Sequence, residues 1–157
     1  MEYKKRVSES RTEMIHLLVP GNLNHHNRLY GGQLLKWLDE AAAITAMRHS
    51  EGEVMTAGID HLDFKAGAVL GDRINIHGYV TYVGRTSMEV RLDTYAEKID
   101  GGLTLINVAY FIMVGVDENY RPREVPGLIL ETDAERAEWD AALKRKEQRK
   151  ERGSVKK

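Results

Sequence analysis

Apolar positions between about Gly31 and His49 recur at intervals of three and four residues. This spacing places them on one broad face of an α-helix. The face contains Leu34, Leu35, Leu38, Ala41, Ala42, Thr45 and Ala46. The pattern therefore predicts one long helix whose apolar face packs against a core.

Four segments after this helix have the composition and alternation typical of β-strands. They cover residues 54–64, 72–83, 86–96 and 103–116, and residues 11–19 are a shorter candidate before the helix. One face carries Ile74, Ile76, Val80 and Tyr82 in the second segment, and Met88, Val90, Leu92 and Thr94 in the third. We expect each of these two strands to have one solvent-exposed face. The last segment is apolar on both faces, which favours a central or interface strand.

The connections between strands are short and contain turn-forming residues, VGR at 83–85 and DGG at 100–102, so neighbouring strands should pair antiparallel. One strand, one buried helix and four further strands predict an α+β fold.

Thr132-Asp133-Ala134-Glu135 has the capping-box pattern, in which Thr132 and Glu135 each accept the other's backbone N–H. We divide the chain into a domain over residues 1–130 and a charged C-terminal helix with a basic tail over 131–157.

Composition narrows the possible functions. The chain has 157 residues and 42% hydrophobic content, which suits one globular domain. It has no cysteine, which excludes disulfides, thiolate metal ligands and a cysteine nucleophile. Apolar runs are too short to span a bilayer and the N-terminus lacks a signal-peptide segment, so we expect no membrane association and a cytoplasmic location.

Charge is distributed unevenly, although the net charge is only -1. Residues 143–157 carry eight Lys/Arg and two Glu, which leaves 15 basic and 22 acidic residues, or -7, on residues 1–142. The simpler interpretation of the basic tail is a solvated, frayed helix end; the other is a surface that attracts an anion such as a nucleotide phosphate. Basic residues with interleaved aromatics do not spread over a face of the body, so we expect no nucleic-acid partner.

Asp39 is a carboxylate at the edge of the apolar face of the long helix. Its closest neighbours there, Ala42, Ala43 and Ala46, are too short to cover it. One interpretation is a partly exposed Asp bonded to a loop, and the other is a carboxylate with room for a ligand or a second chain. Glu40, by contrast, falls near Lys36 on the outer side, where an exposed ion pair is expected.

A polar loop precedes the helix and contains Asn24, His25, His26, Asn27, Gly31 and Gly32. Unpaired backbone amides at the start of a helix can bind a ligand oxygen, as in an oxyanion site. The His25-His26 pair lacks the further convergent ligands that a metal site needs, so we predict no bound metal.

These residues resemble a known family. The segment Asn24-x6-Gly31-Gly32-x-Leu34-Leu35-x3-Asp39-Glu40-Ala41 is similar to the signature of the hotdog-fold acyl-CoA thioesterases, or acyl-CoA hydrolases. TAGIDHLDF at 56–64, Gly71-Asp72 and VGRTSMEV at 83–90 are similar to further stretches of that family, so the resemblance covers about residues 10–126. The family often has glycine at Asn27, a mild change because Asn tolerates left-handed conformations. It often has proline at Gly67, a change that should loosen the loop without affecting the chemistry.

The resemblance implies a curved antiparallel sheet wrapped around one long central helix. It implies two protomers that join their sheets edge to edge in a homodimer, which often assembles into a homohexamer as a trimer of dimers. It also implies that Asn24 of one protomer and Asp39 of its partner face a shared active site.

The implied reaction is hydrolysis of an acyl-CoA thioester to a free fatty acid and coenzyme A. Asp39 would act as general base on water or as a nucleophile forming an anhydride, Asn24 would orient the water or the carbonyl, and the Gly32 amide would stabilise the oxyanion. No cofactor is required, because coenzyme A belongs to the substrate. Arg85 and Thr86 would contact the coenzyme A moiety or be ordinary solvent-facing turn residues.

Two other functions fit the same fold. The protein would be an acyl-CoA-binding sensor if it bound its ligand without cleaving it. It would be a hydratase or dehydratase if His25 or His26 supplied a second acid/base group beside the carboxylate.

Overall fold

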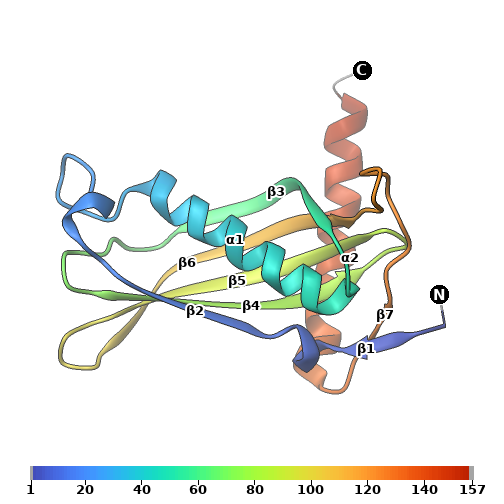
Figure 1. Cartoon of the computed structure of the whole chain (residues 1–157), viewed down its shortest axis with the longest axis horizontal. Coiled ribbons are helices and arrows are strands. Elements are labelled where there is room, and N and C mark those ends of the chain that lie inside the picture. The colour runs from blue at the N-terminus through green and yellow to red at the C-terminus, as the bar shows by residue number, and fades with distance from the viewer. Residues whose placement is uncertain (1, 156–157) are drawn as a thin grey trace.

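A curved antiparallel sheet of five strands wraps around one long helix (Figure 1). The computed structural model describes residues 2–155. Helix α1 (Gly31–Ser50) lies across the inner face of the sheet and α2 (Asp133–Val155) crosses the outer face. The strands, in sheet order, are β2 (Thr12–Leu17), β4 (Arg73–Val83), β5 (Ser87–Glu97), β6 (Leu103–Gly115) and β3 (Val54–Phe64).

The predicted α+β layout is confirmed. The long helix begins at Gly31, as expected, and β3 has the predicted bounds. Each pair of neighbours in the sheet is antiparallel, and β6 lies between β5 and β3, which confirms an internal strand. A small parallel pair of β1 (Lys4–Arg6) and β7 (Gly127–Ile129), and 3-10 turns at Val7–Ser10 and Pro20–Asn22, were not predicted.

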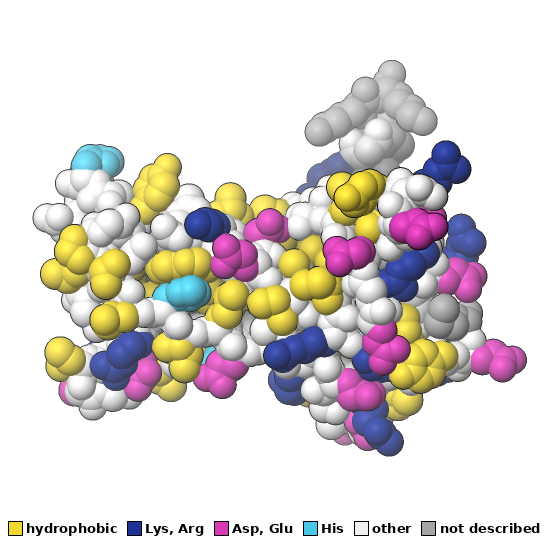
Figure 2. Space-filling view, viewed as in Figure 1, with side chains coloured by type: hydrophobic (Ala, Val, Ile, Leu, Met, Phe, Trp, Pro, Cys, Tyr) yellow, Lys and Arg dark blue, Asp and Glu magenta, His cyan; other side chains and the backbone are white. Residues whose placement is uncertain are grey.

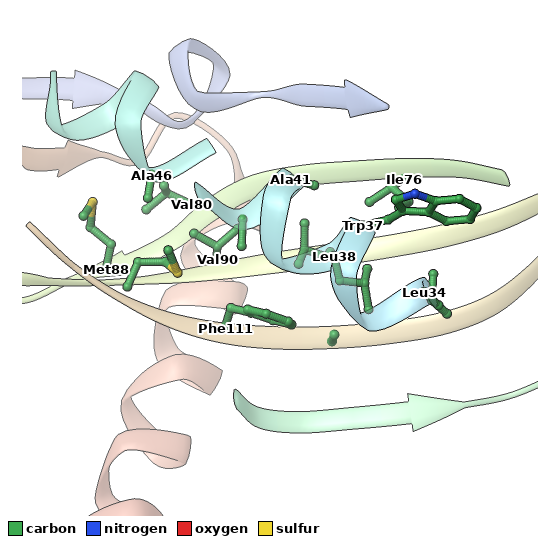
Figure 3. Close-up of a cluster of buried hydrophobic side chains, with 14 of the residues drawn as sticks. Leu34, Trp37, Leu38, Ala41, Ala46, Ile76, Val80, Met88, Val90 and Phe111 are labelled. Carbon is green, nitrogen blue, oxygen red and sulfur yellow. The ribbon is translucent and has the colours of Figure 1, made fainter. Parts of the chain in front are cut away.

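The core lies between α1 and the inner face of the sheet (Figure 3). Its labelled members are Leu34, Trp37, Leu38, Ala41 and Ala46 from the helix, and Ile76, Val80, Met88, Val90 and Phe111 from the sheet. The helix approaches the sheet closely at Gly78, where an added Cβ would lie 2.7 Å from Thr45 Oγ1 and 2.9 Å from Leu92 Cδ2. The missing side chain at Gly78 therefore allows α1 to pack close to the sheet.

The outer faces of β4 and β5 differ from the prediction. A register shift between Val80 and Tyr82 turns Tyr82 to the outer face, where its ring packs 4.4 Å from that of Trp139 in α2. Placing Tyr82 on the face of Val80 was therefore wrong. The expectation of a solvent-exposed second face was also wrong for part of that face, because α2 covers it there and Glu89 on β5 is 2% exposed.

Helix α2 starts as the capping pattern indicates, with one change. The Thr132 hydroxyl accepts the backbone N–H of Glu135 at 3.0 Å, but the Glu135 carboxylate accepts the N–H of Glu131 rather than that of Thr132. The carboxylate thus satisfies an amide one residue further from the helix. A boundary between two units near residue 130 stays a prediction.

The basic part of α2 is not a solvated end. Arg145 forms an ion pair with Glu89, and Arg149 and Arg152 form ion pairs with Asp60 on β3. These contacts contradict the interpretation as a frayed tail, at least as far as Arg152, while the last two lysines lie outside the described residues. No helix between residues 2 and 155 is long and apolar enough to cross a membrane.

Candidate active site

Asp39 is exposed on α1 and faces the edge strand β3. Its Oδ1 accepts a 2.6 Å hydrogen bond from the hydroxyl of Thr56. Of the two interpretations, a loop partner is wrong, because Thr56 lies inside a strand. No role for Thr56 is predicted from the sequence, where its position at the start of the TAGIDHLDF motif is the available signal.

A pocket of about 370 Å³ opens beside this carboxylate. It is lined by Gly32, Leu35, Lys36, Asp39, Ile59 and Phe111. Leu35, predicted to belong to the core, is half-buried because it faces this pocket. Lys36 also lines the pocket. Among residues 2–155 no ion pair joins Lys36 to Glu40, so that predicted pair was wrong. The pocket thus combines apolar walls with one carboxylate and one ammonium group.

Gly32 occupies the first turn of α1, where backbone amides have no acceptor within the helix. No group within residues 2–155 accepts its N–H. A Cβ at this position would lie 2.6 Å from Cε1 of Tyr30, so a side chain here would displace the Tyr30 ring. The structure therefore brings the two predicted site residues Gly32 and Asp39 to one pocket.

Asn24 organises the loop before α1. Its Oδ1 accepts the backbone N–H groups of His26 at 2.8 Å and Arg28 at 3.2 Å, and its carbonyl accepts the N–H of Asn27 at 3.0 Å. Asn27 has φ +58°, which confirms that asparagine adopts the left-handed conformation here. Asn24 does not line the pocket of Asp39, and its side-chain amide nitrogen has no acceptor among the described residues.

The two histidines of this loop are remote from the carboxylate pocket. His25 and His26 are both exposed, their rings lie 3.9 Å apart, and neither lines the pocket. Within this protomer, the acid/base partner that a hydratase would need is therefore not beside Asp39.

Arg85 and Thr86 lie in the turn between β4 and β5, at the opposite end of the sheet from the Asn24 loop (Figure 1). The Arg85 side chain is 80% exposed and its guanidinium is 4.0 Å from Glu124. It borders a separate cavity of about 340 Å³ that Lys4 and Trp139 also line. One protomer therefore does not bring this turn to its own Asp39.

Comparison with known proteins places this geometry in a family. The thioesterase superfamily model matches residues 26–102. YkhA of Bacillus subtilis, described as an uncharacterized acyl-CoA thioester hydrolase, is 34% identical over 145 residues, which are 92% of this chain and 84% of that protein.

Solved structures agree with these matches. An apo-hexameric acyl-CoA thioesterase is 39% identical, with a TM-score of 0.94, over 98% of this chain and 99% of that chain. An asparagine-to-alanine variant of Staphylococcus aureus acyl-CoA hydrolase in complex with coenzyme A is 33% identical, with a TM-score of 0.93, over 99% of this chain and 94% of that one. Structures of the same enzyme with an aspartate or a threonine replaced by alanine also match. The chain thus belongs to the hotdog-fold acyl-CoA thioesterases, a family of acyl-CoA hydrolases.

Proposed function

We propose that this protein hydrolyses acyl-CoA thioesters to a free carboxylic acid and coenzyme A, with Asp39 as the general base. The observation that carries the proposal is the Thr56–Asp39 hydrogen bond, 2.6 Å long, at the rim of a pocket that also holds the Gly32 amide. Carboxylate, oriented donor and free backbone N–H are the groups that thioester hydrolysis requires.

The roles follow from these positions. The Thr56 hydroxyl occupies Oδ1 of Asp39, which leaves Oδ2 to take a proton from water as the water oxygen attacks the thioester carbonyl. Negative charge then develops on the carbonyl oxygen, where the Gly32 N–H stabilises it. The tetrahedral intermediate collapses with cleavage of the C–S bond, and the coenzyme A thiolate leaves and is protonated.

A second copy of the chain supplies Asn24 in this proposal. Within residues 2–155, β3 pairs with β6 alone, so one edge of β3 is free, and Met55 and Ile59 on it are 50% and 41% exposed. Figure 2 shows hydrophobic side chains in a band across the face that carries α1. A partner that pairs along β3 would cover apolar surface and place its own Asn24 near Asp39.

The proposed dimer assembles further into a hexamer, as a trimer of dimers. The apo-hexameric acyl-CoA thioesterase with a TM-score of 0.94 supports six-chain assembly. Arg85 and Thr86 would contact the coenzyme A moiety of a substrate bound at another protomer's Asp39, and the exposed Arg85 guanidinium suits a phosphate group. A cytoplasmic location and activity without a cofactor stay predictions.

A product assay tests the proposed reaction. Purified protein is incubated with acyl-CoA substrates of increasing chain length, and free thiol is measured with a thiol-reactive dye. Steady thiol release supports hydrolysis. A change in enoyl absorbance without thiol release would indicate a hydratase, and binding without either product would indicate a sensor; both results would overturn the proposal.

A further inference from the structure

We infer that α2 holds the middle of β3 in place from the outer face of the sheet, and that Asp60 is a positioning residue for the site on the inner face. The inference rests on the proposed function for its kinetic consequence. Its structural part concerns β3 alone and can be tested separately.

Asp60 is a buried carboxylate whose two oxygens are both bound by α2. Arg149 Nη1 donates to Oδ2 at 2.9 Å and Arg152 Nη2 donates to Oδ1 at 2.5 Å. The Asp60 side chain is only 4% exposed, whereas that of Arg152 is 62% exposed. A carboxylate removed from water requires such partners, so each guanidinium constrains where Asp60 can lie.

Helix α2 is itself anchored to the centre of the sheet. Arg145 donates to both carboxylate oxygens of Glu89 on β5, at 3.0 and 2.8 Å, and Arg149 lies 3.8 Å from the same carboxylate. Glu138 accepts a hydrogen bond from Arg91, also on β5. The helix therefore connects the edge strand to β5 by a path that does not pass through β6.

The backbone of β3 needs this support where the site is built. Register shifts fall between Thr56 and Gly58 and between Ile59 and His61, so the ladder to β6 is interrupted twice in a short stretch. Bulges bend a strand and leave residues unpaired. This stretch contains Thr56, which bonds Asp39, and Ile59, which lines the pocket. Asp60 is the extra residue at the second register shift.

The test uses Arg152→Gln, which removes one guanidinium but leaves Arg149 in place. Hydrogen exchange followed by mass spectrometry should show faster exchange over residues 54–64 and unchanged exchange over β5. The kcat for thiol release should fall about tenfold with KM within about twofold of the parent, because reacting groups displaced by a fraction of an ångström lose rate rather than binding. Arg152→Lys keeps the charge and should recover most of the kcat.

Arg136→Gln is the matched control, since the side chain of Arg136 is exposed and pairs with Asp133 on α2 itself. The Arg136→Gln variant should have the hydrogen exchange and the kinetic constants of the parent. Unchanged exchange over residues 54–64 in Arg152→Gln, or faster exchange in all strands alike, would overturn the inference. If the parent released no thiol, the proposed function would fail, and the exchange measurement would still decide whether α2 holds β3. If Asp60→Asn folds, its exchange over residues 54–64 should be faster and its kcat lower than those of Arg152→Gln.

Discussion

The hydroxyl of Thr56 donates a 2.6 Å hydrogen bond to the carboxylate of Asp39, and this bond joins the edge strand β3 to the central helix α1. One carboxylate oxygen is thereby fixed, and the other is available at the rim of the pocket. The position of the edge strand and the orientation of the proposed base are consequently linked, so a change in either should be measurable in turnover.

Asp39→Asn should lower turnover by about a hundredfold or more, as losses of a general base do. The substitution keeps the shape of the side chain, and the Thr56 hydroxyl can still donate to the amide oxygen, so folding should be preserved. Thiol release and the circular dichroism spectrum check both expectations. Glu40→Gln changes an exposed neighbouring carboxylate and is the control. Thiol release at the parent rate in Asp39→Asn would show that Asp39 is not the base.

Thr56→Val replaces the hydroxyl by a methyl group of similar size. We expect kcat to fall about tenfold, because the carboxylate then loses an oriented donor. Thr56→Ser retains the hydroxyl and should stay within about threefold of the parent. Steady-state kinetics on one acyl-CoA compare the three proteins. Equal kcat values for the valine and serine variants would contradict the role of this hydrogen bond.

Mixed dimers test the shared site. A dimer of one Asn24→Ala chain and one Asp39→Asn chain has both lesions in one site and an intact second site if the two residues meet across the interface. After random remixing of two nearly inactive parents, about a quarter of the activity should return, since about half of the dimers are mixed and each has one intact site. Mass spectrometry of tagged chains confirms exchange. Complete exchange without recovered activity would assign both residues to the same protomer's site, or remove one of them from catalysis.

Gly78→Ala should destabilise the fold by about 1–3 kcal/mol, because the new methyl group would meet Thr45 and Leu92 in a packed core. Urea unfolding at a fixed protein concentration measures the free energy. The control is Gly21→Ala, where an added Cβ meets nothing within 4 Å. A loss in Gly78→Ala no larger than in this control would show that α1 is not seated on Gly78.

Burial lowers the pKa of His49, although the Pro126 carbonyl that its Nε2 contacts at 2.8 Å acts in the opposite direction. A folded-state pKa below the unfolded value of about 6.5 means that the unfolded chain binds the proton more tightly. The free energy of unfolding should therefore fall as the pH drops from about 6.5 towards the lowered pKa. In His49→Gln this fall should be smaller, with a remainder from His16, whose pKa burial also lowers. An identical pH dependence in the two proteins would rule out the effect of His49.

Local patterns were sufficient to predict most of the fold. Helical spacing indicated α1 because most of its small and apolar residues face one sheet, and alternation indicated β5 because Met88, Val90, Leu92 and Thr94 are all buried. Tyr82 was misplaced because a register shift changes the face of a residue without changing the hydrophobic pattern. The ion pairs of Arg149 and Arg152 with Asp60 were missed because the partners are some ninety positions apart along the chain.

In the site, too, local features could be predicted from the sequence, and contacts between distant residues could not. The helix-start amide of Gly32 and the carboxylate of Asp39 were recognisable as candidates from the sequence, and both residues line one pocket. Thr56 could not be assigned from spacing, because its hydrogen bond depends on how α1 lies over β3. The meeting of Asn24 with Asp39 stays a prediction, since it depends on a second chain.

The close contact of α1 with Gly78 limits how the pocket beside Asp39 can be widened in this protein. A helix in van der Waals contact with a sheet along small residues has no free volume into which it can retreat, so the pocket wall that α1 forms is rigid. A wider pocket then requires smaller side chains at its lining, such as Leu35 on α1, Ile59 on β3 or Phe111 on β6, rather than a shift of the helix. We therefore expect selection for longer or bulkier acyl groups to substitute these lining residues and to leave the alanines of α1 that pack against the sheet unchanged.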